Sequence, residues 1–420
     1  MVLRGCFGKG KDDMLYTSYW LTNVRIEQGY VMEDGQVAGT DTEICHIRIE
    51  DGAIAEIIGT QLELQSNLPK YDCKELLMLP SFEEAHIHLD KTYWSGPWKA
   101  VKQVSSIFER IEEEKILLPK LLPMAKQQAE SILTLIQGYG VTHVRSHCNI
   151  EPVSGLHRLE ATKKALDTFS GKISSEIVAF PQHGLLRSDS VQLVKRSLAE
   201  GATHVGGVDP FTVDGDIEKS LQTMVELAVL NNAGIDIHLH DKNEAGKQTL
   251  MRLADLTEEA GLQGKVTVSH AFWFAGAQPQ EAEEAAKRMA SLGMSIASTV
   301  PIGKLMMPLP MLSNQGVTVK LATDSLTDHW SPFGNGDQLE KAGRFAELYG
   351  LNDEWSLSQT LGFITGGITP LDQKGEQVWP KAGDTASFVL LHASCSAEAV
   401  ARRAKRQAVW YEGNLVSGSL

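Results

Sequence analysis

Two histidines stand one residue apart in the stretch EAHIHLDK, near the end of a predicted strand. These are His86 and His88, and Lys91 follows three residues after the second. Side chains on a strand alternate between its two faces, so both imidazoles point the same way. Imidazole is a common metal ligand, but a lone HxH pattern also arises by chance on the wet face of a strand. Other parts of the chain have to decide between these two interpretations.

Further polar residues end other short apolar runs. His238 and His240 end the run IDIHLH, where alternation again places both side chains on one face. Single candidates at the ends of further runs are His147, Gln182, Asp209, His270 and Asp324. Imidazoles from two or more strands together with a carboxylate suit a divalent metal ion.

The elements that must position these residues are eight apolar runs that alternate with helical stretches over residues 81–375. The helical stretches, such as SVQLVKRSLAEG, have apolar residues at helical spacing and often end at Gly or Asn. This repeat predicts a (β/α)8 TIM barrel, in which active sites form at the carboxyl ends of the strands. The rival fold, a doubly wound open sheet, is disfavoured because no GxGxxG follows the first strand.

Each candidate alone has an ordinary alternative. His147 is better explained as a residue that fills the barrel mouth than as a ligand. Asp324 alone is compatible with a cap of the following helix, and His270 with a hydrogen-bonded core residue. The coincidence that the whole set falls at the same end of the predicted strands favours a shared site.

Both ends of the chain predict a second, smaller unit. Residues 1–80 and 376–420 contain short strands separated by turns, with Asp-Gly pairs at Asp34-Gly35 and Asp51-Gly52 that indicate hairpins. We expect these two segments to form one composite β-sandwich beside the barrel of residues 81–375.

Composition limits the classes of function. The net charge is −14 and the pI about 5.4, which argues against nucleic acid or an anionic membrane as the main partner. The five cysteines are scattered without a CxxC pair, so we expect neither a disulfide framework nor a cysteine zinc site, and the cytoplasm is the default location. The piece LRGC near the N-terminus is similar to a lipoprotein cleavage site, but no apolar core precedes it, and no apolar run is long enough to span a bilayer.

These residues resemble the amidohydrolase superfamily, specifically its cytosine deaminase-like branch. The motifs that carry the resemblance are HIHLDK (86–91), THVRSH (142–147), IVAFPQ (177–182), SHA (269–271) and TDSLTDHWSPFGNGD (323–337). Within that branch the chain most resembles the N-isopropylammelide isopropylamidohydrolases, which remove an alkylamine from a hydroxylated s-triazine. The motifs shared with them are GGVDP (206–210), HLHD (238–241), SHAFWFA (269–275) and WSPFGNGD (330–337).

The resemblance implies one divalent metal ion, zinc or ferrous iron. Its implied ligands are His86, His88, His238 and Asp324. Members with two metals use a lysine at the end of the fourth strand, where this chain reads VGGVDP without a lysine. The implied chemistry is hydrolysis of an exocyclic C–N bond on a small nitrogen heterocycle by a metal-activated water. Asp324 would take a proton from that water, and His270 would hold the hydroxide and the developing oxygen. The family also suggests a homo-oligomer.

The residue that protonates the leaving amine separates this chain from cytosine deaminase itself. There, a glutamate three residues after the fifth-strand histidine shuttles the proton, and Asp241 occupies that position here. Strand alternation puts Asp241 on the face opposite His238, and the stretch Asp241-Lys242-Asn243-Glu244 predicts a capping box for the next helix. His240 shares the inward face and is therefore the expected proton shuttle.

Substrate contacts are expected from Lys91, Gln182 and Asp209. Lys91 would neutralise an oxyanion on a hydroxylated ring, and its alternative is a solvated charge beyond the strand end. Trp94, Trp98, Trp273 and Trp330 are compatible with a pocket lining, although aromatic residues near a barrel mouth more often only pack. Asp328 and His329 either contact substrate or shape their loop, and Cys148 is expected to be a small buried apolar residue.

Two further classes of protein compete with the expected enzyme, and cytosine deaminase proper remains an alternative within it. A non-catalytic scaffold with this fold has no use for so many ligand-type groups, and its behaviour would not change when metal is removed. A protein that only binds a heterocycle would use Lys91, Gln182 and Asp209, and its binding would be insensitive to a chelator. The number of converging histidines favours the enzyme.

Overall fold

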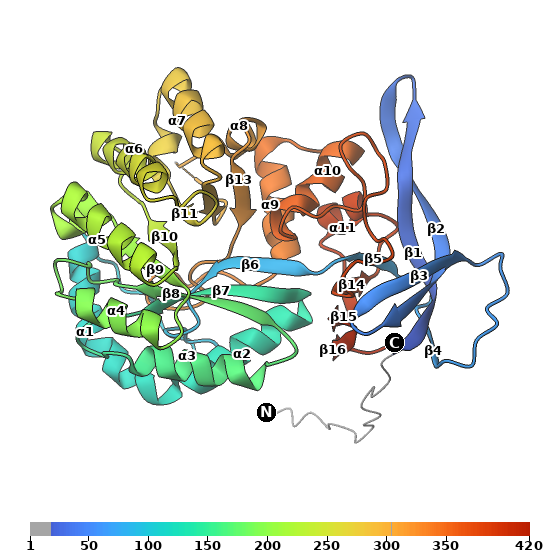
Figure 1. Cartoon of the computed structure of the whole chain (residues 1–420), viewed down its shortest axis with the longest axis horizontal. Coiled ribbons are helices and arrows are strands. Elements are labelled where there is room, and N and C mark those ends of the chain that lie inside the picture. The colour runs from blue at the N-terminus through green and yellow to red at the C-terminus, as the bar shows by residue number, and fades with distance from the viewer. Residues whose placement is uncertain (1–17, 304) are drawn as a thin grey trace.

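A computed structural model describes residues 18–303 and 305–420, so the segment with Cys6 and the LRGC pattern lies outside the described residues. Its larger part is the predicted (β/α)8 barrel (Figure 1). The eight parallel strands, in their hydrogen-bonded order, are β6 (Phe82–Ile87), β7 (Val141–Asn149), β8 (Ser174–Phe180), β9 (His204–Val208), β10 (Gly234–His238), β11 (Val266–Ser269), β12 (Ser295–Ser298) and β13 (Thr318–Leu321).

The barrel closes just beyond the ends of β6 and β13. Asp324 pairs with Ile87 in an isolated parallel bridge. Its N–H donates to the carbonyl of His86 at 2.7 Å, and its carbonyl accepts from the N–H of His88 at 3.2 Å. The backbone that closes the barrel therefore also brings Asp324 against His86 in β6 and against His88 directly after it.

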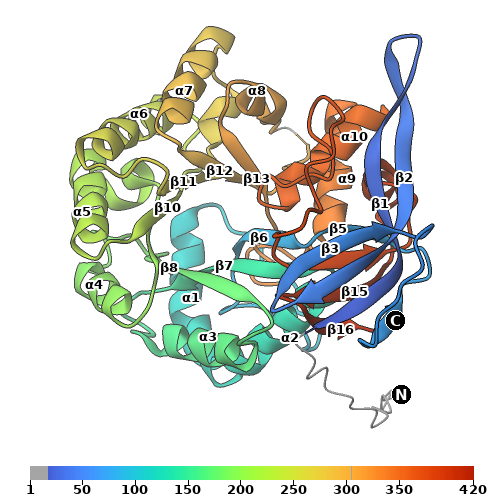
Figure 2. The same ribbon diagram turned by 45° about the vertical axis from the view of Figure 1, so that its right-hand side comes forward.

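The helices form a ring around the strands (Figure 2). Their bounds are α1 (Ile107–Leu121), α2 (Ala125–Gly138), α3 (His157–Thr168), α4 (Val191–Ala199), α5 (Ile217–Leu230), α6 (Glu244–Glu259), α7 (Pro279–Ser291), α8 (Leu309–Asn314), α9 (Gln338–Tyr349), α10 (Glu354–Thr360) and α11 (Ser396–Arg402). Short single turns are η1 (Leu122–Met124), η2 (Pro210–Asp214), η3 (Phe272–Ala275) and η4 (Leu361–Ile364). Both α1 and α2 lie between the first two barrel strands, so the first connection is the longest.

A second sheet contains strands from both ends of the chain, as expected. It consists of β1 (Ser18–Glu33), β2 (Gln36–Glu50), β3 (Ala53–Gly59), β4 (Lys70–Asp72), β5 (Leu77–Pro80), β14 (Phe388–Leu391), β15 (Arg406–Tyr411) and β16 (Asn414–Gly418). The strands join in one hydrogen-bonded sheet, ordered β16-β15-β14-β5-β1-β2-β3, with β4 also on β1. Both Asp-Gly pairs form tight turns, with positive φ at Asp34 and Gly35 and at Asp51 and Gly52.

Strand alternation explains how this sheet attaches to the barrel. On β5, Leu77 and Leu79 belong to the barrel core, whereas Met78 packs in the core of the second sheet. On β14, Val389 faces the barrel core and Phe388 the other core in the same manner. One pair of strands thus serves two hydrophobic cores.

The described cysteines, Cys45, Cys73, Cys148 and Cys395, are free and buried. Among the described residues, none of the helices has both the length and the apolar character needed to cross a bilayer.

Candidate active site

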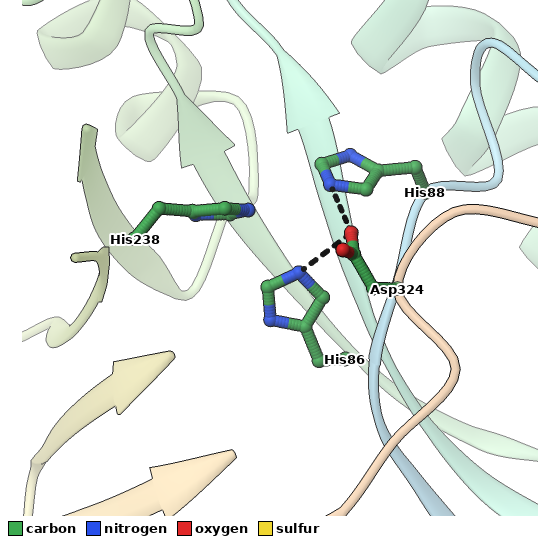
Figure 3. A group of neighbouring side chains, drawn as sticks. All are labelled: His86, His88, His238 and Asp324. Atoms are coloured by element: carbon green, nitrogen blue, oxygen red, sulfur yellow. Dashed lines mark ion pairs between the residues drawn. The ribbon is translucent and has the colours of Figure 1, made fainter. Parts of the chain in front are cut away.

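Four side chains of the types that ligate metals converge at the carboxyl end of the barrel (Figure 3). His86 is the second-to-last residue of strand β6, and His88 is the residue directly after that strand. His238 ends β10, and Asp324 lies in the segment after β13. One ligand atom from each lies within 4.8 Å of those of the others. The Oδ1 atom of Asp324 is 3.4 Å from Nε2 of His86 and 3.2 Å from Nε2 of His88.

The other ring nitrogen of His86 and of His88 is held by the fold. Nδ1 of His88 donates to the carbonyl of His147 at 3.1 Å. Nδ1 of His86 lies 2.7 Å from the hydroxyl of Ser269, which itself donates to Asp236 at 2.7 Å. Because the hydroxyl proton is used there, Ser269 accepts the Nδ1 proton of His86. Both Nε2 atoms therefore carry lone pairs.

These lone pairs and the Asp324 carboxylate are all acceptors that face one another. Acceptors that face one another in this way repel, and a cation bound between them turns the arrangement into a favourable one. Both ring nitrogens of His238 are buried without a hydrogen-bond partner among the described residues. Burial lowers the pKa values of His88 and His238, so these imidazoles stay neutral and able to bind a metal. The donor set fits a divalent ion.

His240 and His270 lie beside this group. Their rings stack with centroids 4.5 Å apart, and Nε2 of His270 is 3.8 Å from Oδ2 of Asp324. Nδ1 of His240 donates to Oδ2 of Asp209 at 2.8 Å, and the His240 N–H donates to Oδ1 at 2.6 Å. Burial alone lowers the pKa of His240, but Asp209 and then Asp324 outweigh burial, and the pKa is raised. Nδ1 is occupied by Asp209, which leaves Nε2 of His240 as the nitrogen available for chemistry.

Three site residues have left-handed backbone conformations that non-glycine residues rarely adopt. The φ angles are +37° at Asp209, +71° at His270 and +64° at Asp324. Each follows directly or closely after a barrel strand, where the chain has to turn outward. Such conformations persist only where surrounding structure enforces them, and they concentrate at functional sites.

The sequence profile of the amidohydrolase family matches residues 124–417, which is more than half of the chain. The chain belongs to the amidohydrolase family. It is 46% identical over 405 residues to the uncharacterized protein YahJ of Escherichia coli (strain K12), covering 96% of this chain and 88% of that protein. It is 29% identical to the N-isopropylammelide isopropyl amidohydrolase of Pseudomonas sp. (strain ADP), over 82% of this chain and 87% of that one.

A solved structure supports the same assignment. The crystal structure of N-isopropylammelide isopropylaminohydrolase from Burkholderia multivorans superposes with a TM-score of 0.84 at 27% identity, covering 96% of this chain and 99% of that chain. The fold and the resemblance expected from the sequence are thus confirmed. As a member of its family, the protein is a metal-dependent amidohydrolase that acts on C–N bonds outside peptides.

In this amidohydrolase, two of the expected substrate contacts bind each other. Nζ of Lys91 donates to Oε1 of Gln182 at 2.9 Å, and Lys91 is only 1% exposed. The alternative of a solvated charge is therefore wrong. The counter-ion of Lys91 is Glu114 on α1, at 3.5 Å.

Glu114 is a central residue of this region that sequence reasoning missed. It is fully buried and accepts hydrogen bonds from His183 at 3.0 Å, His329 at 2.7 Å and the indole of Trp330 at 2.8 Å. Burial alone raises its pKa, but Lys91 and the two histidines outweigh burial and hold the pKa well below its usual range. A signal for it existed, because Glu114 falls in the apolar stripe of α1 with Ile111 and Leu118.

The expected capping role of Asp241 is wrong. Helix α6 begins at Glu244, and Asn243 is its N-cap, with its side chain accepting from the N–H of Ala245 at 3.1 Å. Asp241 instead accepts a hydrogen bond from the hydroxyl of Thr212. The cap lies two residues later because Asp241 is already bound by Thr212 and Asp209.

Several of the remaining residues that the sequence singled out pack in the core or shape a loop. His147 is fully buried and stacks on His86, with centroids 3.7 Å apart. Cys148 is buried in the barrel core, as expected. Among the tryptophans, Trp273 packs in the core and Trp98 is 72% exposed, whereas Trp330 binds Glu114. Asp328 accepts from the N–H groups of Trp330 and Ser331, which fits the loop-shaping alternative.

Proposed function

We propose that this amidohydrolase hydrolyses an exocyclic C–N bond on a small nitrogen heterocycle and releases ammonia or an alkylamine. The observation that carries the proposal is the convergence of His86, His88, His238 and Asp324, with His240 and His270 beside them. The similarity to enzymes named for an N-alkylated ammelide supports the heterocyclic substrate. A deaminase named for pterins, 23% identical over 70% of this chain, supports the broader class.

The four converging residues would hold one divalent ion, zinc or iron. When bound, such an ion would supply Lewis acidity, which lowers the pKa of water so that a nucleophilic hydroxide is available near neutral pH. No lysine ends β9, whose sequence is HVGGV, and this supports one ion rather than two.

The remaining chemistry belongs to the chain's own side chains. Asp324 accepts a proton from the attacking water while the water oxygen forms a bond to the ring carbon. His270 donates a hydrogen bond to the oxygen that develops charge. His240, held through Nδ1 by Asp209, delivers a proton from Nε2 to the amine nitrogen, and the C–N bond breaks as the neutral amine leaves.

Substrate orientation is assigned to the buried Lys91–Gln182 pair, whose side chains lie over the same end of the barrel as the metal ligands. Asp209 was expected to contact the ring. Because both its oxygens already accept from His240, we propose that it positions His240, and a ring contact would be additional. The free buried cysteines favour the cytoplasm as the location, and the homo-oligomeric state stays a prediction.

A product assay by mass spectrometry tests the proposal. Metal-loaded protein is offered oxo-pyrimidines, pterins, ammelide and N-alkyl ammelides, and each released amine is identified. Conversion that stops after chelation and returns with zinc or iron supports the proposal. Absence of any conversion by protein that carries metal would rule out this substrate class.

A further inference from the structure

A cavity of about 190 Å³ opens beside Asp324. It lies between the segment after β12 and the loop and helix α9 that follow β13. Its lining includes Thr299, Ser325 and Ser331 and two cationic residues, Lys341 and Arg344. The cavity thus combines hydroxyl groups with the positive charges that α9 contributes next to Asp324.

Lys341 is buried without a partner. It is 5% exposed, and its ammonium makes no hydrogen bond or ion pair within 4.0 Å to any described residue. The only other lysine that is equally buried, among the described residues, is Lys91, which has both Glu114 and Gln182. A buried ammonium without a counter-ion is strongly unfavourable, so its presence beside a cavity indicates a missing anionic partner.

The nearby carboxylates are already occupied. Glu84 accepts from the N–H of His86, from the N–H and hydroxyl of Thr323 and from the side-chain amide of Gln338, which uses all four of its acceptor positions. Asp324 faces the histidines of the metal site. Burial, followed by the charge of Arg344, lowers the pKa of Lys341, and the carboxylates of Glu340, Glu84 and Asp324 act in the opposite direction without outweighing them.

The cavity wall also contains a strained residue. Val300, directly after Thr299, has a φ of +52°, which is an outlier for a β-branched side chain. Within the part of the chain that the structure describes, Arg344 pairs only with Glu340, one turn away on the same helix, through Nε and Nη2. Its Nη1 makes no hydrogen bond to any described residue and is available to a ligand.

We propose that this cavity binds a small oxyanion of the carboxylate or phosphate type, held by Lys341 and Arg344 next to the reacting centre. The anion is either a substituent of the heterocyclic substrate or a free ion that binds beside it. An anion that is part of the substrate rests on the proposed function, whereas the binding of an anion in this cavity does not. In either case Lys341 is the residue on which binding depends.

The first experiment measures anion binding without turnover. Metal-loaded protein is unfolded thermally in increasing phosphate, with chloride as the control at equal ionic strength. We expect a saturable rise of roughly 1–3 °C in Tm that chloride does not give. Lys341→Met should abolish the rise, whereas Lys287→Met, which removes an exposed lysine from α7, should retain it. Lys341→Arg keeps the charge and should retain the rise even if the methionine variant folds poorly.

The second experiment identifies the source of the anion. Competition binding compares uracil with its 5- and 6-carboxylates in the wild type and in both Lys341 variants. If the anion belongs to the substrate, one carboxylate binds at least tenfold more tightly than uracil, and Lys341→Met removes that preference. A phosphate effect without a carboxylate preference indicates a free anion.

The inference is overturned if neither phosphate nor the ring carboxylates depend on Lys341. That result would leave the proposed C–N hydrolysis intact, because the hydrolysis is judged from products of uncharged rings. Conversely, a Lys341-dependent phosphate effect in a protein that converts none of the offered rings would support the anion site and contradict only the proposed function.

Discussion

His86 and His88 each present one ring nitrogen to the metal site and have the other held by the fold. The hydrogen bonds from His86 to Ser269 and from His88 to the carbonyl of His147 set the tautomers. This arrangement is typical of metal-binding imidazoles, because the hydrogen bond at the second ring nitrogen fixes the orientation of the ring and raises its basicity. The proposed metal site therefore depends on residues outside the ligand set, among them Asp236 behind Ser269.

Removal of one ligand tests this site directly. His86→Ala should lower bound metal and hydrolytic activity together, because a three-ligand remnant loses both affinity and water activation. Metal content by elemental analysis and turnover would be measured on the same sample. His392→Ala, which removes an exposed histidine, is the control and should change neither. A metal-loaded and active His86→Ala protein would exclude this ligand set.

The proton delivery assigned to His240 makes a different prediction. His240→Asn should retain metal but lower kcat by about 10²–10⁴, the usual contribution of a general acid. Asp209→Asn should give a smaller loss, because His240 remains while its orientation at Nδ1 is weakened. Near-normal turnover in His240→Asn, with metal bound, would move the shuttle role to another residue.

The histidine positions were predictable from sequence because period-two alternation and strand ends determine where they point. Asp236 was not predicted, although it lies two residues before His238 and shares its face of β10. Its role depends on Ser269 and Arg145 from other strands, with Arg145 Nη1 at 3.0 Å. Partners that arrive from distant strands leave no local pattern.

At the scale of elements, helix α1 connects the loops around the site. Through Glu114 it binds Lys91 after β6, His183 after β8, and His329 and Trp330 after β13. One carboxylate thus holds three separate loops at the barrel mouth. The predicted alternation of strands and helices is consistent with a helix between the first two barrel strands, but it does not indicate which glutamate of this helix points inward.

Loss of that charge should be costly. Glu114→Gln keeps the shape of the side chain but leaves the buried Lys91 without a counter-ion, and we expect a loss of roughly 3–5 kcal/mol in the free energy of unfolding. Chemical denaturation measures this loss. Glu112→Gln, at an exposed position of the same helix, should cost far less.

A double variant separates charge from packing. If the unpaired ammonium causes the loss, Lys91→Met combined with Glu114→Gln should be less destabilised than the sum of the two single variants. Strict additivity would contradict the ion pair as the source of the effect.

The order of the elements was well predicted, whereas one of their boundaries was not. Eight strands emerge from the sequence because buried parallel strands appear as short apolar runs between helical repeats. The N-cap of α6 was placed two residues early, since both Asp241 and Asn243 have capping side chains. The choice between them is made by Thr212 and Asp209, which bind Asp241 from η2 and from the end of β9.

At the scale of the whole molecule, the sheet from both chain ends is fastened to the outer helices by a buried carboxyl group. Glu27 on β1 is 1% exposed and accepts from the N–H of Ser396, the first residue of α11. Its Oε2 has no hydrogen-bond partner among the described residues. Nearby, Glu354 at the start of α10 accepts from Thr40 of β2 at 2.6 Å.

This contact makes stability depend on pH. Burial raises the pKa of Glu27 from 4.5 to about 7, although the hydrogen bonds from Ser396 act in the opposite direction. Between these values the folded protein binds a proton that the unfolded chain has released. The stabilisation is therefore complete below pH 4.5 and is lost as pH rises through 7. At 1.36 kcal/mol per pH unit, the interval corresponds to about 3 kcal/mol.

Glu27→Gln should remove this dependence, because an amide keeps the acceptor for Ser396 and never ionises. We expect the variant to unfold at nearly the same denaturant concentration as the wild type at pH 4.5, and to be up to about 3 kcal/mol more stable at pH 8. Denaturation curves at the two pH values measure the difference. An equal difference at both would show that packing, rather than the proton on Glu27, controls how the terminal sheet is held against α10 and α11.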